Sequence, residues 1–375
     1  MINLNDKSIQ DYRNHYSDEL RRKIVDGINN LPRTSINCFN NEPVSNLFQH
    51  NGFTLDQTIS DLLTEKIEYL CKKYSQFGIY FRTAEFVFLT LNKIKKDLKD
   101  VEDKSLRKEL RKQHVESYFD SPWIQNLAIS NPGYEVSDKE MSHFVKDIVG
   151  GKLKTLNGLI SSVLRYEILT SDQRDTVLEK LEIEVCPYCN RNFISKFKRN
   201  GKLKSTADLD HFYPKTYFLL FSLSLYNFVP SCQICNSRFK SYKGAKILNP
   251  YTDKVDYKKL KFTYEMIPNS KLNMFIGESM DFQIKLECLD ESYKDHIDMF
   301  ELENLYDTHK ISICEILYKK TAYNDTYVDS INTMLNEMNL TKEERDLFMY
   351  GIDMKEESFY KRPLSKLIFD LVNQD

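Results

Sequence analysis

Several features that define other protein classes are scarce or missing in this sequence of 375 residues. Glycine occurs only 11 times, which argues against a loop-rich or all-β chain and favours helices. No apolar run approaches the roughly 20 residues of a membrane helix, so we expect no membrane association. The segment from Met1 to Asp6 has no charged stretch followed by an apolar one. We therefore expect no signal peptide and a cytoplasmic location.

The composition is otherwise that of a soluble globular protein, with 41% hydrophobic and 29% charged residues. A chain of this length can bury a sizeable core and form two or three domains. Its eight cysteines should not form a disulfide framework in a reducing compartment. Four of them are scattered singly, and we expect these to be buried thiols: Cys38, Cys71, Cys288 and Cys314.

Apolar spacing predicts an α+β fold that is mainly α. Residues 1–180 are expected to be a helical region. Its predicted helices begin at Ser17, run over 56–74, run over 84–118 with a break near 100–104, and cover 154–166 and 171–181.

Residues 181–250 form the expected central domain, in which Asn200-Gly201 predicts a hairpin turn. Residues 251–375 are expected to begin with two strands, around 262–266 and 282–288, and to continue as helices from about Ser292. Thr341 and Glu344 form a capping-box pattern, and 363–372 predicts a helix that docks on the body.

Two C-x2-C pairs dominate the central region. Cys186-Pro-Tyr-Cys189 and Cys232-Gln-Ile-Cys235 are separated by 42 residues, a pattern that suits a structural zinc site with four thiolate ligands. The first pair alone would also fit a redox motif, but that site needs a βαβ setting and a hairpin is expected here. A zinc deaminase would need an H-x-E or C-x-E pair upstream, and the sequence has none.

The central region is also a basic island. From Cys186 to Lys246 there are 11 Lys and Arg residues but only two acids, Asp208 and Asp210, a net charge of +9. The remainder of the chain then carries −11, given the total of −2. Such an island is a candidate surface for a polyanion, although a solvated charged face would have the same composition.

Asp210 and His211 lie between the cysteine pairs and have the chemistry of phosphodiester hydrolysis. A neutral imidazole can take a proton from water near pH 7, so His211 is the candidate general base. Asp210 would face the other side of a strand and reach a divalent ion. Asn236 could supply a second oxygen ligand, and such a donor set suits Mg²⁺ or Mn²⁺.

Other polar residues of this region have weaker interpretations. Asn227 could orient the loop or the imidazole, and Asn236 could instead cap a helix. Asp208 is either a supporting acid near the metal or a surface residue. A further group is predicted to lie at helical spacing beside Asn236 and hold phosphates: Arg238, Lys240 and Lys243. His309 and Glu315 do not share a helix face well, so we expect both on the surface.

Taken in order, the C-x2-C, Asp-His-x2-Pro, Asn and C-x2-C-Asn elements resemble the HNH (His-Me finger, ββα-metal) endonucleases in their zinc-stapled branch. The resemblance covers Cys186 to Lys246. It implies that Asp210 and Asn236 hold one catalytic metal, that His211 is the base and that Asn227 is the structural asparagine. The last motif position is Asn rather than His, a variant familiar in that family.

A narrower resemblance links Asn249-Pro250-Tyr251 and the helical tail to the HNH component of Septu-type antiphage systems. It implies a role in defence together with an SMC/ABC-like ATPase partner. The expected substrate is nucleic acid, most of all DNA. The alternative from another class is a zinc-ribbon nucleic-acid-binding or scaffold protein without catalysis.

Overall fold

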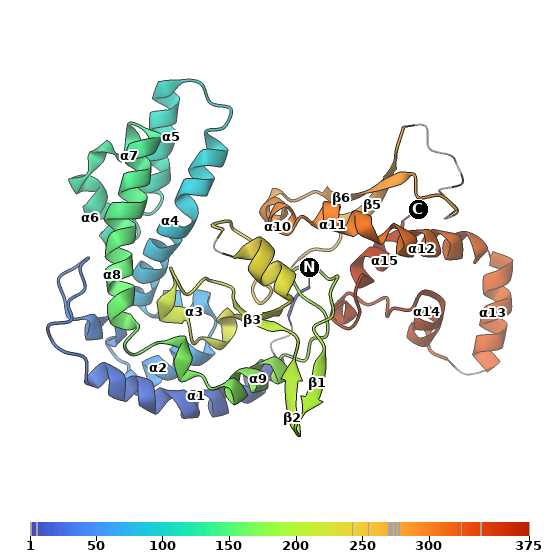
Figure 1. Ribbon diagram of the computed structural model, residues 1–375, viewed down its shortest axis with the longest axis horizontal. Helices are drawn as coiled ribbons and strands as arrows, with labels where there is room; N and C mark the ends of the chain where they lie inside the picture. The colour runs from blue at the N-terminus through green and yellow to red at the C-terminus, as the bar shows by residue number, and fades with distance from the viewer. Residues whose placement is uncertain are drawn as a thin grey trace.

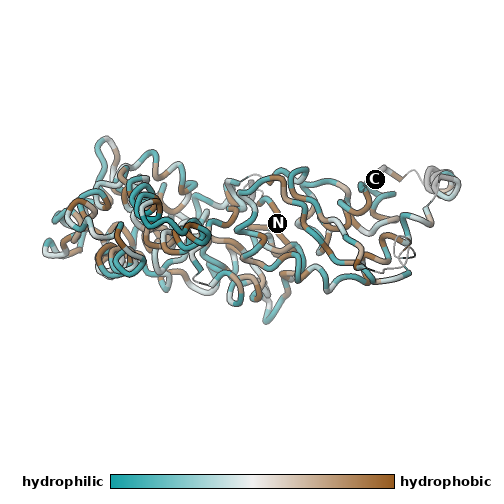
Figure 2. The backbone as a smooth tube through the Cα atoms, turned by 90° about the horizontal axis from the view of Figure 1, so that it is seen from above, coloured by the Kyte–Doolittle hydropathy of each residue, from teal (hydrophilic) through white to brown (hydrophobic). Residues whose placement is uncertain are grey.

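The computed structural model of the protein describes residues 2–4, 7–241, 243–253, 255–268, 273, 276, 278–323, 325–337 and 340–374. The fold is α+β and mainly helical, with small antiparallel sheets, which confirms the predicted class. Figures 1 and 2 show an elongated molecule, with N-terminal helices at one end and C-terminal helices at the other. The segment that carries the paired cysteines lies between them.

Helices build the N-terminal region: α1 (Lys7–Asn29), α2 (Leu55–Thr64), α3 (Ile67–Lys73), α4 (Ser75–Asp97), α5 (Lys104–Glu116), α6 (Pro122–Ser130), α7 (Asp138–His143), α8 (Gly150–Ile160) and α9 (Ser171–Lys180). The predicted break near 100–104 is confirmed, and Asp103 caps α5 by accepting a hydrogen bond from the Leu106 amide.

Four predicted helices in this region have other boundaries in the structure; the one predicted from 84 already begins at Ser75, as α4. Ser17 does not begin a helix; it lies inside α1, where its buried hydroxyl bonds Ser60 of α2. The predicted helix over 56–74 is two helices, because the backbone is extended at Glu65 and Lys66. The helix predicted over 154–166 begins earlier and ends at Ile160.

The central region contains two pairs of antiparallel strands. β1 (Lys196–Arg199) and β2 (Lys202–Ser205) form the predicted hairpin, and both turn residues, Asn200 and Gly201, have positive φ angles as a tight primed turn requires. β3 (Asp208–His211) pairs with β4 (Phe228–Ser231), and the π-helical segment η7 (Ile234–Lys240) follows.

The C-terminal region begins with the predicted strands, β5 (Leu260–Met266) and β6 (Phe282–Cys288), which pair antiparallel. Helices complete it: α10 (Lys294–Met299), α11 (Leu302–Tyr306), α12 (Lys310–Ala322), α13 (Asp325–Glu337), α14 (Lys342–Tyr350) and α15 (Ser365–Val372).

Two C-terminal predictions are confirmed. Thr341 and Glu344 form the capping box of α14. Helix α15 docks on the body, where the Asp370 carboxylate accepts the Phe262 amide of β5 and pairs with buried Lys366.

One hydrophobic cluster runs through all three predicted regions, and a smaller one lies among α4, α5, α6 and α7. Tyr16 of α1 donates to the Leu223 carbonyl of the central region at 2.7 Å. The first residues also pack against the central region, where the amides of Ile2 and Leu4 donate to the carbonyls of Pro187 and Pro250. The boundaries proposed at 180 and 250 stay a prediction.

The prediction of four buried single thiols was wrong: each is only half-buried, at Cys38, Cys71, Cys288 and Cys314.

Candidate metal centre and catalytic cleft

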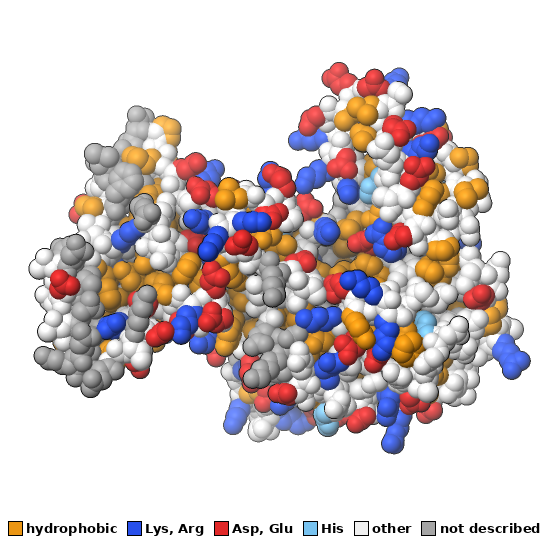
Figure 3. Space-filling model, turned by 180° about the vertical axis from the view of Figure 1, so that it is seen from behind, with side chains coloured by type: hydrophobic (Ala, Val, Ile, Leu, Met, Phe, Trp, Pro, Cys, Tyr) orange, Lys and Arg blue, Asp and Glu red, His pale blue; other side chains and the backbone are white. Residues whose placement is uncertain are grey.

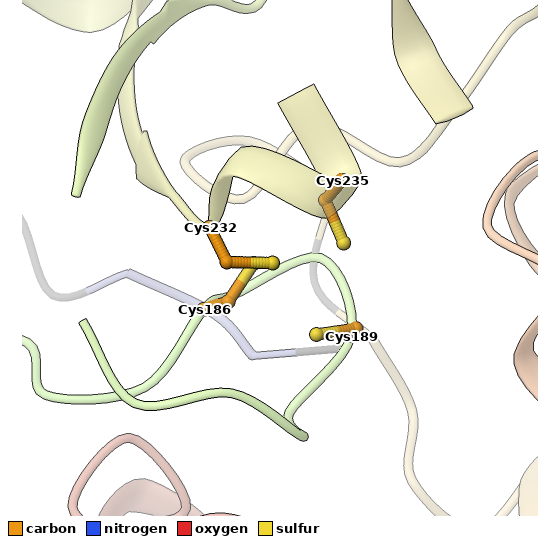
Figure 4. A group of neighbouring side chains, drawn as sticks. All are labelled: Cys186, Cys189, Cys232 and Cys235. Atoms are coloured by element: carbon orange, nitrogen blue, oxygen red, sulfur yellow. The ribbon is translucent and has the colours of Figure 1, made fainter. Parts of the chain in front are cut away.

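The paired cysteines converge on one point. All four are buried and free of disulfides, and their Sγ atoms lie within 4.8 Å of one another. Figure 4 shows the sulfur atoms turned toward one another from the loop of the first pair, the end of β4 and the start of η7. Tetrahedral zinc with Zn–S bonds of about 2.3 Å places its sulfur ligands about 3.8 Å apart. The cluster therefore fits a metal such as zinc.

The local sequence shapes this loop for a metal. The Cys186 amide donates to the Asn192 carbonyl, and Asn190 closes the turn at φ 49°, a left-handed conformation that asparagine tolerates. The Arg191 amide donates to Cys189 Sγ at 3.4 Å, and the Asn192 side chain donates to Cys232 Sγ at 3.2 Å. Hydrogen bonds from the neighbouring thiols, Cys186 first, and from the Asn192 amide lower the pKa of Cys232 and favour its thiolate.

The cluster also fixes the ends of the strand pair. In the β3–β4 ladder Asp210 lies opposite Val229 and His211 opposite Phe228. Cys232 directly follows β4 and Cys235 belongs to η7, so a metal there would hold the end of the strand against the start of the helix. The result is a strand–strand–helix unit beside the cluster.

His211 is held by one hydrogen bond and two rings. Its Nε2 donates to the Ser222 carbonyl at 2.9 Å, since a carbonyl oxygen can only accept. The rings of Tyr166 and Phe228 pack edge-on, with centroids at 4.9 and 5.2 Å. Burial lowers the pKa of His211 to about 4, so the ring is neutral at pH 7. With the proton on Nε2, the Nδ1 lone pair is the proton acceptor of the ring.

Asp210 is buried, at 6% exposure, and already has partners. The Tyr188 hydroxyl donates to its Oδ2 at 2.6 Å, and the Lys240 ammonium donates to its Oδ1 at 3.0 Å. Lys240 also donates to the His211 carbonyl at 2.6 Å. Burial raises the pKa of Asp210 against the attraction of Lys240, which lowers it.

This placement corrects the prediction for Lys240. Its side chain is 4% exposed and paired with a carboxylate, so its ammonium does not stand open to solvent as a phosphate contact would. Arg238 is exposed on η7, whereas Lys243 is exposed beyond the end of that helix rather than at helical spacing on it.

Asn236 lies on η7 and faces β3. Its Nδ2 donates to the Asp208 carboxylate at 3.1 Å, which leaves its Oδ1 without a hydrogen-bond donor among the described residues. Asp208 is half-buried and holds this amide in place, so of its two interpretations the structure favours the supporting acid.

Asn227 is fully buried and organises the loop between β3 and β4. Its Oδ1 accepts the Tyr213 amide at 2.8 Å, and its Nδ2 donates to the carbonyls of Tyr213 and Phe221. The same loop carries the Ser222 carbonyl that orients His211. Asn227 thus acts on the imidazole through the loop rather than by contact.

A cleft of about 340 Å³ brings most of the predicted site together, with Asp210, His211, Asn236 and Lys240 among its lining residues. Lys215 and Ser237 also line it and were not singled out in the sequence. Asn227, Arg238 and Lys243 are not in its wall. The cleft brings together one imidazole, two side chains with oxygen ligands for a cation, and the exposed Lys215 ammonium, which can attract an anion.

The hydrogen-bonding partners of the site were the part that the sequence did not predict. Tyr188 stands inside the first C-x2-C pair, and that position was the signal that could have placed its hydroxyl near the site. Lys240 and Asn192 gave no such signal, because their partners lie 30 and 40 residues away.

The basic island is less positive in space than in sequence. Lys202 and Lys204 of β2 form ion pairs with Asp172 and Asp175 of α9.

His309 accepts a hydrogen bond from Arg191, and Glu315 is exposed on α12.

Comparisons with protein-family models, curated proteins and solved structures found no match to this chain. In the described part of the chain, no helix combines the length and apolar character that crossing a membrane requires.

Proposed function

We propose that this protein is a metal-dependent endonuclease of the HNH type. It would hydrolyse phosphodiester bonds of nucleic acid, with DNA as the expected substrate. One observation carries the proposal: His211 lines a cleft with its Nε2 proton committed to the Ser222 carbonyl. This tautomer leaves Nδ1 as a proton acceptor beside two oxygen donors, Asp210 and Asn236.

The chain's own residues divide the work. His211 takes the proton of the attacking water, and its lowered pKa keeps it neutral at pH 7. The loop held by Asn227 fixes the ring, so little reorganisation is needed in the transition state. The Lys215 ammonium is exposed at the cleft and can attract the phosphate.

Asp210 and Asn236 would hold the metal. Both line the cleft, and carboxylate and amide oxygens are ligands that Mg²⁺ and Mn²⁺ accept. Asp210 Oδ1, which Lys240 alone contacts among the described residues, can accept a further partner. A bound divalent ion supplies Lewis-acid stabilisation of the charge that develops on the phosphate. The cysteine cluster would support this site as a structural zinc centre.

The resemblance to the HNH component of Septu-type systems extends the proposal to antiphage defence with an SMC/ABC-like ATPase partner in the cytoplasm. The helical regions on either side of the cleft would bind that partner or control access to the cleft. Reconstitution with the ATPase should change the cleavage rate, and an unchanged rate in its presence would count against this extension.

The nuclease itself is tested with purified protein, Mg²⁺ or Mn²⁺ and supercoiled plasmid. Nicking that requires the divalent ion and disappears in His211→Ala supports it. Tight nucleic-acid binding that does not require Mg²⁺ or Mn²⁺, without any cleavage, would instead favour a zinc-ribbon binding protein. The Lys240–Asp210 ion pair favours that second candidate, because a carboxylate satisfied by lysine needs no metal.

A further inference from the structure

A second cavity, of about 270 Å³, adjoins the catalytic cleft. Lys240 lines both, so the two spaces lie on either side of one side chain. The cavity is enclosed by α3, α4 and the segment from Lys243 to Asp253. Figure 3 shows this side of the molecule hollowed between the tall lobe that carries α4 and α5 and the rest of the body.

Aromatic rings form one wall of the cavity. Phe81, Phe88 and Tyr213 line it and are half-buried, so part of each ring faces the space. Phe81 and Tyr213 pack edge to face at 5.1 Å between centroids, which holds both rings in position. The face of one of these rings offers a flat apolar surface on which a planar ligand can stack.

Carboxylates stand against this wall. Glu68 of α3 and Glu85 of α4 line the cavity and are half-buried. Burial raises the pKa of Tyr213, and the negative charges of nearby carboxylates, Glu68 first, raise it further, which places these charges close to its ring. Two exposed ammonium groups, Lys243 and Lys246, line the same cavity.

We propose that this cavity binds a nucleobase of the strand whose phosphate occupies the catalytic cleft, and that it favours bases with an exocyclic amine. The inference rests on the proposed function. The rings would stack on the base, and the carboxylates would accept hydrogen bonds from its amine. The ammonium groups of Lys243 and Lys246 would contact the phosphates on either side of that base.

The size and position of the cavity fit this occupant. A volume of about 270 Å³ lies below the range of drug-sized sites and suits one base rather than a larger cofactor. A base stacked in a duplex would have to leave the stack to enter, so single-stranded or extruded nucleotides are the expected substrates.

The wall of the cavity needs close packing of the loop on α4. A Cβ on Gly244 would clash with the Phe88 carbonyl oxygen, and the Asn92 side chain donates to the Gly244 carbonyl at 2.7 Å. The neighbouring residue, Ala245, lines the cavity and is half-buried. A large side chain at Ala245 would therefore fill the cavity.

The test is the binding of the mononucleotides AMP, CMP and TMP, measured by NMR titration without divalent metal. AMP and CMP should bind at least fivefold more tightly than TMP, because thymine has no exocyclic amine. Ala245→Trp should weaken AMP and CMP at least tenfold, while Ala322→Trp, at an exposed site of α12, should leave binding unchanged.

A conservative variant covers the case in which Ala245→Trp fails to fold. Glu68→Gln with Glu85→Gln should reduce the preference for CMP over TMP to within twofold, with Glu102→Gln as the exposed control. No measurable mononucleotide binding at millimolar concentration, or equal binding by wild type and Ala245→Trp, would overturn the proposal.

Cleavage of plasmid with Mn²⁺, measured in parallel, separates this inference from the proposed function. Base binding that Ala245→Trp removes, in a protein that never cleaves, supports the cavity and counts against the nuclease. Cleavage by wild type and Ala245→Trp at equal rates, with no selective mononucleotide binding, retains the nuclease and rejects the cavity.

Discussion

The Lys240 ammonium is the cation that balances Asp210 in the cleft beside His211. Its Nζ lies 2.9 Å from Asp210 Oδ2 and donates to the His211 carbonyl, with both charged side chains almost fully buried. A buried carboxylate without a partner is costly, so the pair determines whether the cleft is stable without a divalent ion. The proposed metal ligand therefore has a partner already built into the fold.

Replacing Lys240 should show this dependence. Lys240→Met leaves Asp210 buried without its cation and should lower the free energy of unfolding by about 3 kcal/mol. The double variant Asp210→Asn with Lys240→Met should lose less than the sum of the two single changes, because the two groups contact each other.

Urea unfolding at pH 7 without added divalent metal measures these losses. Lys243→Met, at an exposed position, is the matched control and should stay within about 0.5 kcal/mol of wild type. Equal stabilities for the Lys240 and Lys243 variants would show that the ion pair does not hold the cleft.

Among the elements, those specified by neighbouring residues could be predicted from the sequence. Asn200-Gly201 and the Thr341–Glu344 capping box each act within a few residues, and both are confirmed. The helix start predicted at Ser17 was wrong, because serine also occurs inside helices when its hydroxyl has another partner, here Ser60.

The candidate site divides in the same way. The spacing of the cysteines predicted the cluster that they form, since two C-x2-C pairs have few other uses. The pairings of Asp210 with Lys240 and of Asp208 with Asn236 join residues 30 and 28 positions apart. No local pattern encodes such contacts, so they follow only from the packing of η7 on β3.

The packing of the 243–247 segment on α4 gives a test at this scale. Gly244→Ala places a methyl group against the Phe88 carbonyl and should cost on the order of 2 kcal/mol or more of unfolding free energy. Gly151→Ala is the control, because a Cβ there meets nothing within 4 Å and lies inside α8. The control should be neutral or stabilising by up to about 1 kcal/mol, measured by urea unfolding. Two equally stable variants would mean that the loop does not pack as described.

For the whole molecule, buried histidines set the response of stability to acid. His114 is buried beside Thr90, and burial lowers its pKa from the ordinary 6.5 to about 4. The unfolded chain takes up a proton below about pH 6.5 that the folded chain refuses until about pH 4. The contribution of this group to stability is thus complete above pH 6.5 and declines as the pH falls.

His114→Gln removes this titration. Between pH 7.5 and pH 5.0 the wild type should lose about 2 kcal/mol more unfolding free energy than the variant. Urea unfolding of both proteins at the two pH values measures the difference, since all other titrating groups are shared. Parallel losses in the two proteins would show that His114 is not buried as a neutral ring.

If His211 is the base of a metal-dependent nuclease, removing its imidazole should slow DNA cleavage by the whole molecule, and a comparison of three cleavage rates shows whether it does. The single-turnover rate of DNA cleavage with Mn²⁺ is measured for wild type, His211→Ala and His143→Ala, an exposed histidine outside the cleft. Each protein is first shown to hold the same amount of zinc. We expect His211→Ala to be at least about 100-fold slower than wild type and His143→Ala to equal wild type. Cleavage by His211→Ala within about threefold of wild type would contradict it.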